Sequence, residues 1–279
     1  FQKGDVAPKA YLLPVAALAI YALAISIVYT YWKNSPAVTV DNHTITIGNQ
    51  TFYFKDIKHM ALTGKMPFRF IVNYPMEAIA IVFNDGTEKI LFDDMYANSA
   101  EIKLFLDHVF LKKQKFDPTL TAEIDRDELL FEYEDTFKGN QFTSMRGITL
   151  WGFIGFIAFM TTKVKTPQTG AFIAFGFFAT FWFVLHAWLM HYFGLTKDYL
   201  IVRNHNFIWK EKIYRLSNIK EVVFETQGKQ PNSMRIITND FRNKLYPAGT
   251  LRDEMWLDMK RALESRGVKV RNECIFEDN

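Results

Sequence analysis

Two long stretches of the chain carry almost no charge, and this separation limits the possible folds more than any other feature. Residues 10–32 and 147–194 contain Lys163 and Lys165 and no other Lys, Arg, Asp or Glu, although charged residues make up 23% of the 279 residues. The remaining segments are therefore strongly charged. Disordered chains and ordinary water-soluble globules do not separate charge from apolar sequence in this way. We expect an integral membrane protein.

The first uncharged stretch predicts one transmembrane helix. Residues 11–32 form a run of 22 residues without a charge, and a helix of that length extends about 33 Å, enough to cross a hydrocarbon core of about 30 Å. Aromatic residues end the run, so Trp32 and Lys33 are expected at the membrane interface. A cleaved signal peptide is the alternative. The run is longer than a usual signal core and no A-x-A site follows it, which favours an anchor.

The second stretch predicts a transmembrane helical hairpin. Apolar residues 148–162 and 169–194 are separated by a short segment that contains Pro167, with Gly170 just beyond it. A buried hairpin of a soluble protein is the alternative, but both segments are hydrophobic on all sides. The residues expected at the membrane interface are Trp151, Trp188, His191 and Tyr192. Three glycines allow either close approach of another helix or simple lipid contact: Gly152, Gly155 and Gly176.

The two polar blocks, residues 37–113 and 195–271, look like copies of one unit. Two matches share an offset of 162 positions: Asn42-His43 with Asn204-His205, and Asp56-Ile57-Lys58 with Asn218-Ile219-Lys220. Further along, Asn84-Asp85 matches Asn239-Asp240 in the same order. Short matches in a common order predict an internal repeat.

Each copy has the same pattern of elements. Alternating strands come first, with turns predicted at Gly48-Asn49 and Asp85-Gly86 in the first copy. An amphipathic helix follows, with a capping box of Asn98 and Glu101 in the first copy and an end at Gly267 in the second. Strands closed by one C-terminal helix predict a small β-barrel or sandwich. The expected fold class is an α+β membrane protein with three transmembrane helices and two such modules.

Residues 199–225 and the helix after Pro247 carry a resemblance to a known family. They resemble bacterial membrane proteins with pleckstrin-homology-like (PH-like) domains, in which transmembrane helices lead directly into PH-like modules. The resemblance covers nearly the whole chain. Two departures are that one helix precedes the first copy instead of a hairpin, and that the chain begins at Phe1 without Met.

These patterns divide the chain into six segments. They are an N-terminal segment with the first helix (1–36), a first module (37–113), an acidic linker (114–146), the hairpin (147–194), a second module (195–271) and a tail (272–279). Residues 33–146 carry a net charge of −4 and residues 195–279 a net charge of +4. Two crossings separate the modules, so both are expected on one side of the membrane. Positive charges near the helix ends favour the cytoplasmic side of a bacterial inner membrane by five to four.

The sequence offers few candidates for chemistry. Four cations of the second module are candidates for contact with anionic lipid headgroups or a partner, or form a solvated rim: Lys210, Lys212, Arg215 and Lys220. His186 and His191 are five positions apart, which turns them about 140° from each other on a helix and disfavours a haem site. An acidic stretch over residues 117–135 lacks the spacing of an EF-hand and favours a solvated linker.

We expect a protein that is not an enzyme and holds no cofactor or metal. There is no P-loop, G-x-G-x-x-G, H-E-x-x-H or G-x-S-x-G motif, and Cys274 is the single cysteine. A net charge of +3 is too small to indicate nucleic acid. The expected function is a membrane-anchored scaffold, accessory or regulatory subunit. The alternative is a protein that senses or handles anionic lipids, and the expected partners are membrane lipids, other membrane subunits or a second copy.

Overall fold

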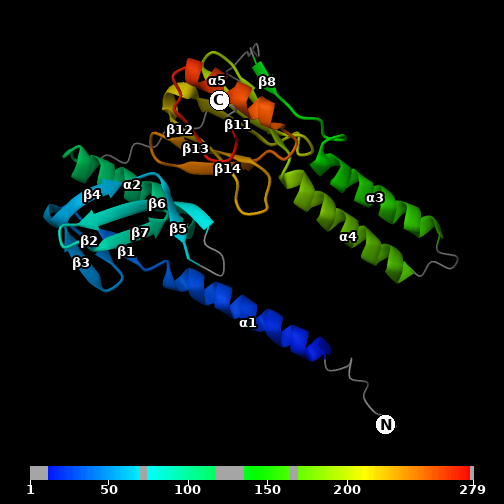
Figure 1. Ribbon diagram of the computed structural model, residues 1–279, viewed down its shortest axis with the longest axis horizontal. Helices are drawn as coiled ribbons and strands as arrows, with labels where there is room; N and C mark the ends of the chain where they lie inside the picture. The colour runs from blue at the N-terminus through cyan, green and yellow to red at the C-terminus, as the bar shows by residue number, and fades with distance from the viewer. Residues whose placement is uncertain (1–11, 70–73, 117–134, 164–168, 277–279) are drawn as a thin grey trace, which may run out of the picture. The chain divides into compact units, whose positions relative to one another are not determined.

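Three apolar helices account for the uncharged stretches of the sequence. A computed structural model describes residues 12–69, 74–116, 135–163 and 169–276, and it divides the chain into two units, residues 1–118 and 119–279. Among the described residues, the helices long and apolar enough to cross a membrane are Pro14–Lys33, Met145–Lys163 and Thr169–Trp188. The chain is therefore an α+β protein with three candidate membrane helices (Figure 1).

The first unit places one long helix before two antiparallel sheets. The helix is α1 (Leu12–Lys33). The first sheet contains β1 (Val38–Val40), β2 (Thr44–Ile47) and β3 (Gln50–Tyr53) in that order. The second contains β4 (Ile57–Ala61), β5 (Lys65–Phe68), β6 (Tyr74–Phe83) and β7 (Glu88–Phe92), with β4, β5 and β7 each paired to β6. The helix α2 (Ser99–Phe105) closes the unit and continues as a π-helix, Leu106–Leu111.

The local predictions for this unit are confirmed at its turns and fail at its helix cap. Gly48 and Gly86 occupy the two predicted turns with φ of 62° and 84°, a conformation that glycine adopts readily. Asn98 is the N-cap residue of α2, but its side chain makes no capping hydrogen bond. Its φ and ψ of −107° and 23° lie outside the extended region from which a capping side chain reaches the first turn. The predicted capping box is therefore wrong.

The second unit begins with an edge strand and a helical hairpin. The strand is β8 (Asp135–Phe137), which lies within the segment predicted as an acidic linker. The helices α3 (Met145–Lys163) and α4 (Thr169–Trp188) follow, and they lie side by side (Figure 1). The ring centroids of Phe153 and Trp182 are 4.4 Å apart, and Trp182 Nε1 donates to Thr149 O at 3.4 Å. The segment predicted to join the helices lies partly outside the described residues.

The second helix of the hairpin ends earlier than the sequence predicts. It ends at Trp188, and residues His191–Leu195 form the strand β9. His191 and Tyr192 therefore lie in a sheet and not in a membrane helix, which corrects their predicted location. The sequence hides this change because β9 is itself buried and apolar, and a short apolar run does not distinguish a helix from a buried strand.

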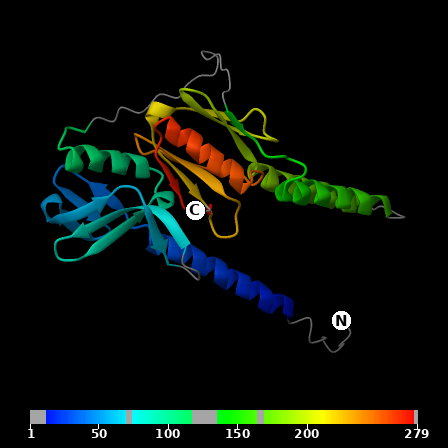
Figure 2. The same cartoon turned by 45° about the horizontal axis from the view of Figure 1, so that its top comes forward.

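The remaining strands of the second unit form two sheets covered by a helix. One sheet has the order β11-β10-β9-β8, with β10 at Tyr199–Asn204 and β11 at Glu211–Arg215. The other has the order β14-β13-β12-β15, with β12 at Ile219–Glu225, β13 at Ser233–Thr238, β14 at Asn243–Pro247 and β15 at Val270–Asn272. The helix α5 (Asp253–Ser265) lies against these strands (Figure 2). It packs on the core through Trp256, which is fully buried and contacts the rings of Phe193 and Phe224.

Matching structural details support the predicted repeat. One 3₁₀ turn directly precedes β4, and another directly precedes β12. The pairing of β4 with β6 shifts register after Ile57, the first residue of β4, and the pairing of β12 with β13 shifts in the same way after Ile219. In the first unit Asn84 N donates to Asp56 O at 2.8 Å, and in the second Asn239 N donates to Asn218 O at 2.9 Å. The matched residues Asn84 and Asn239 therefore make equivalent backbone contacts in the two units.

Candidate lipid-facing site at the base of the helical hairpin

The chain path of the second unit gathers several loops around the base of its hairpin. The strand β9 leads away from the end of α4, β10 returns, and β11 leads away again. Asn204, at the end of β10, donates through Nδ2 to Ala187 O at 2.8 Å, and His205 N donates to Met190 O at 3.0 Å. The loop of residues 205–210 is therefore fixed beside the last turn of α4. We call the surface around the start of α3 and the end of α4 the hairpin base.

The tip of this loop exposes large apolar side chains. Ile208 is 80% exposed and Trp209 is 73% exposed. The Lys210 ammonium lies 4.6 Å from the ring centroid of Trp188, the last residue of α4. Exposed aliphatic and aromatic groups next to a lysine, at the end of an apolar helix, are typical of residues at a membrane interface.

The structure separates the four cations that the sequence grouped together. Lys210 lies at the hairpin base, whereas Arg215 lies at the other end of β11, with its guanidinium 5.9 Å from the ring centroid of Tyr199. Five residues of strand separate them by about 16 Å. Lys212 is exposed between them, and Lys220 is on β12 with its ammonium 3.8 Å from the ring centroid of Phe241. Lys210 contacts Trp188, the last residue of α4.

The predicted interface residues lie in different surroundings. Trp32 and Lys33 are exposed at the end of α1, and Trp188 is 51% exposed. Trp151 is half-buried against Phe142 and Phe183. His191 and Tyr192 pack inside the second unit, where His191 Nδ1 is 2.9 Å from Pro247 O and the Lys138 ammonium lies 4.9 Å from the Tyr192 ring centroid.

Open space surrounds the three glycines for which the sequence allows either helix packing or lipid contact. A Cβ atom at Gly152, Gly155 or Gly176 would meet no other heavy atom of the described residues within 4 Å. The contact between α3 and α4 therefore does not use them. The surfaces that they form on these helices stay available to another helix or to lipid.

Two buried histidines near the hairpin base are neutral at pH 7. Burial is the largest cause that lowers the pKa of His205 to about 4, and the positive charge of Lys138 acts in the same direction. Burial also lowers the pKa of His191, although the carbonyl of Pro247 favours its charged form. The positive charge on this surface therefore comes from lysine and arginine side chains.

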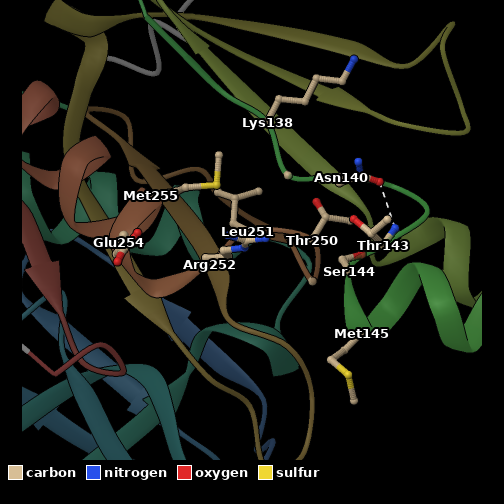
Figure 3. A pocket seen from close by; sticks show the side chains of 12 residues that line it. Lys138, Asn140, Thr143, Ser144, Met145, Thr250, Leu251, Arg252, Glu254 and Met255 are labelled. Atoms are coloured by element: carbon tan, nitrogen blue, oxygen red, sulfur yellow. Dashed lines mark hydrogen bonds between the residues drawn. The ribbon is translucent and has the colours of Figure 1, made fainter.

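One pocket of about 580 Å³ opens between the loop before α3 and the loop before α5 (Figure 3). Gly139 is required there because a Cβ atom would lie 1.8 Å from Thr250 O. Asn140 Oδ1 accepts from Thr143 N at 2.9 Å, which fixes the turn into α3. Figure 3 shows Lys138, Met145 and Glu254 pointing in different directions, so the side chains do not converge on one ligand position.

A second pocket, of about 710 Å³, lies at the end of α4. Its lining includes the two cations Arg146 and Lys229, neither of which was a sequence candidate. The position of Arg146 directly before the uncharged stretch was a usable signal, because cations commonly flank membrane segments. Nothing in the sequence indicated that Arg146 and Lys229 line the same pocket, since the two residues are far apart in the sequence.

The described residues contain no group of three or more His, Cys, Asp or Glu side chains that could hold a metal ion. Most of the predicted acidic stretch, residues 117–134, lies outside the part of the chain that the structure describes. Asp135 at its end pairs with Arg266 at 2.8 Å. No protein-family model matches the chain, and no curated protein is significantly similar to it.

Proposed function

We propose that the protein is a non-enzymatic, membrane-anchored scaffold, accessory or regulatory subunit of a membrane assembly. Its three apolar helices cross the membrane, and its two units are PH-like modules on the cytoplasmic side of a bacterial inner membrane. Two features support this proposal: the helices are long and apolar enough to span, and both units place one helix after their antiparallel strands, with the short strand β15 following that helix in the second unit. Partners are other membrane subunits, a second copy of the chain, or lipids.

The observation that carries the proposal is the direct packing of each unit onto the end of its apolar helix. In the first unit the Tyr31 ring lies 5.4 Å from the Phe68 ring, and the hydroxyls of Tyr31 and Tyr74 are 3.0 Å apart. Tyr96 also donates its hydroxyl to Pro36 O at 2.8 Å. A module held in this way has a fixed orientation relative to its helix, as a docking platform requires.

The strand β3 supplies a surface on which a partner could dock. Among the described residues it pairs only with β2, so its other edge is unpaired. Phe54 N donates to His43 O, so these two residues form a hydrogen-bonded pair. Hydrogen-bonded and non-hydrogen-bonded pairs alternate along an antiparallel hairpin. Thr51, three positions before Phe54, therefore faces Thr46 in a non-hydrogen-bonded pair. The backbone N–H of Thr51 therefore points outward, where it can bind an extended segment of a partner.

The test is affinity purification in mild detergent, with mass spectrometry of the proteins that remain bound. Thr51→Pro removes the outward donor and leaves the β2–β3 bonds intact, whereas Thr51→Val retains the donor and serves as the matched control. We expect a stoichiometric partner with the wild type and with Thr51→Val, and its loss with Thr51→Pro. Retention of the partner by Thr51→Pro would exclude this edge, and a protein that purifies without any partner contradicts the scaffold function.

The second candidate function is recognition of anionic lipid, and the exposed loop with Ile208, Trp209 and Lys210 favours it. Lys210→Glu tests it against Arg215→Glu, which makes the same charge change at the far end of β11. Weaker retention of anionic lipid by the Lys210 variant alone supports lipid recognition at the hairpin base. Equal retention by both variants contradicts it.

A further inference from the structure

The pocket at the end of α4 is lined both by apolar side chains of that helix and by cationic side chains from other segments. Its apolar wall consists of side chains from the last turns of α4: Phe181, Val184, Leu185 and Trp188. The rest of the lining includes Arg146 at the start of α3, together with Lys229 and Gln230 from the loop between β12 and β13. The lining contains no Asp or Glu. The pocket therefore carries positive charge without an internal counter-charge.

Arg146 is available to a ligand. No hydrogen bond or ion pair joins its guanidinium to another residue in the described part of the chain, although the side chain is half-buried. Its position is set by Gly249, where a Cβ atom would lie 3.3 Å from Arg146 Nε and 3.1 Å from the Pro231 Cβ. Holding a half-buried guanidinium without a partner is unfavourable, and an oxyanion ligand would relieve this cost.

The apolar and the cationic lining residues match the two parts of a phospholipid. A guanidinium and an ammonium group together suit a phosphate, because arginine binds two phosphate oxygens at once and lysine adds a point charge. The apolar wall is continuous with the exposed surface of α4, where Phe181 is 55% exposed and Leu185 is 44% exposed. Acyl chains can pack along this surface once α4 is in a bilayer.

We propose that this pocket binds one anionic phospholipid, with its phosphate between Arg146 and Lys229 and its acyl chains along α4. The proposal rests on the membrane placement proposed above and adds a specific lipid site to it. It differs from the exposed loop of residues 205–210, because the pocket holds a single lipid and the loop contacts the surface. The first pocket is a weaker candidate, since Glu254 is part of its lining.

The test is native mass spectrometry of the full chain after delipidation, with phosphatidylglycerol added in one series and phosphatidylcholine of the same acyl chains in another. We compare the double variant Arg146→Gln/Lys229→Gln with Lys212→Gln/Arg215→Gln, which loses the same charge away from the pocket. Each cation near a membrane surface contributes about 1 kcal/mol, so we expect about 10- to 30-fold weaker phosphatidylglycerol binding in the pocket variant. The control variant should bind like the wild type.

A second variant guards against a folding defect. Gln230→Glu puts a carboxylate into the pocket from an exposed loop, so it should weaken phosphatidylglycerol binding without removing any contact within the protein. Equal binding of phosphatidylglycerol by the wild type and both pocket variants would overturn the proposal. So would equal binding of the two lipids, or displacement of the lipid by millimolar inorganic phosphate, which would identify a site for free phosphate.

Extraction of membranes with alkaline carbonate separates this proposal from the membrane placement on which it rests. A chain that is released by carbonate contradicts both. A chain that stays in the membrane fraction but shows no difference between the lipids contradicts only the lipid site.

Discussion

Neutral His205 makes the stability of the second unit depend on pH. The side chain is only 9% exposed, its Nε2 lies 3.3 Å from Thr250 Oγ1, and its ring centroid is 4.9 Å from that of Tyr192. Burial and the charge of Lys138 are the main causes that lower its pKa to about 4, against about 6.5 in an unfolded chain. Between these two values the unfolded state binds more protons than the native state, so the free energy of unfolding falls as the pH falls from above 6.5 towards 4.

The size of the effect follows from the two pKa values. Between pH 8 and pH 5 a fully shielded histidine with these values would lose about 2 kcal/mol of stability. Solvent screening at this partly accessible site reduces the expected loss to about 1 kcal/mol. His205→Gln removes the titrating group. The drop in its unfolding free energy between pH 8 and pH 5 should therefore be smaller than that of the wild type by this amount, even if the variant is less stable at every pH.

The assay is unfolding by denaturant in one detergent at four pH values between 8 and 5, followed by tryptophan fluorescence. Trp256 is fully buried in the core of the second unit and reports on its unfolding. The matched control is His43→Gln, because His43 is an exposed histidine of the first unit. The lowered pKa of His191 leaves part of the pH dependence in the variant. Identical pH dependence of the wild type and His205→Gln would refute the reasoning.

Three further predictions concern a buried ion pair, a close backbone contact and a half-buried thiol. Lys103→Met leaves the carboxylate of Asp93 without its buried ion-pair partner at 2.5 Å, so we expect a loss of about 3 kcal/mol in unfolding free energy, and a smaller loss when Asp93→Asn is added. Gly139→Ala places a Cβ atom 1.8 Å from Thr250 O, a backbone atom that cannot move freely, so thermal unfolding should show a loss of at least about 2 kcal/mol. Burial raises the pKa of Cys274 to about 11, so a maleimide should react slowly with the native protein at pH 7.5 and rapidly after unfolding in urea.

Local sequence signals predicted the elements that depend on neighbouring residues. The helices Pro14–Lys33 and Met145–Lys163 are long uncharged runs, and such runs need no tertiary information to be recognised. The turns at Gly48 and Gly86 follow from the ease with which glycine adopts a positive φ. The helix α5 ends before Gly267, as the sequence predicts, because that glycine has a φ of 79° and stops the helix.

The internal repeat is recognisable in the sequence at its turns and not at its buried strand positions. Asn84 and Asn239 match in sequence, and each donates its backbone N–H to the carbonyl of the residue that directly precedes an earlier strand, β4 for Asn84 and β12 for Asn239. The matched residues are turn residues whose role is set by local backbone geometry, so the same short motifs recur in both units. Buried strand positions differ between the units because many apolar side chains can fill a core.

By itself, the sequence determined the three apolar helices, the turns and the two-module order, because each depends on length, charge or backbone preference within a short window. The tertiary structure alone decided that His191 lies in β9, since a buried strand and the end of an apolar helix have the same composition. It also decided that Lys210 and Arg215 lie at opposite ends of β11, and that Arg146 and Lys229 line one pocket. Residues distant in sequence meet only through chain folding, and no local pattern encodes which cations share a surface.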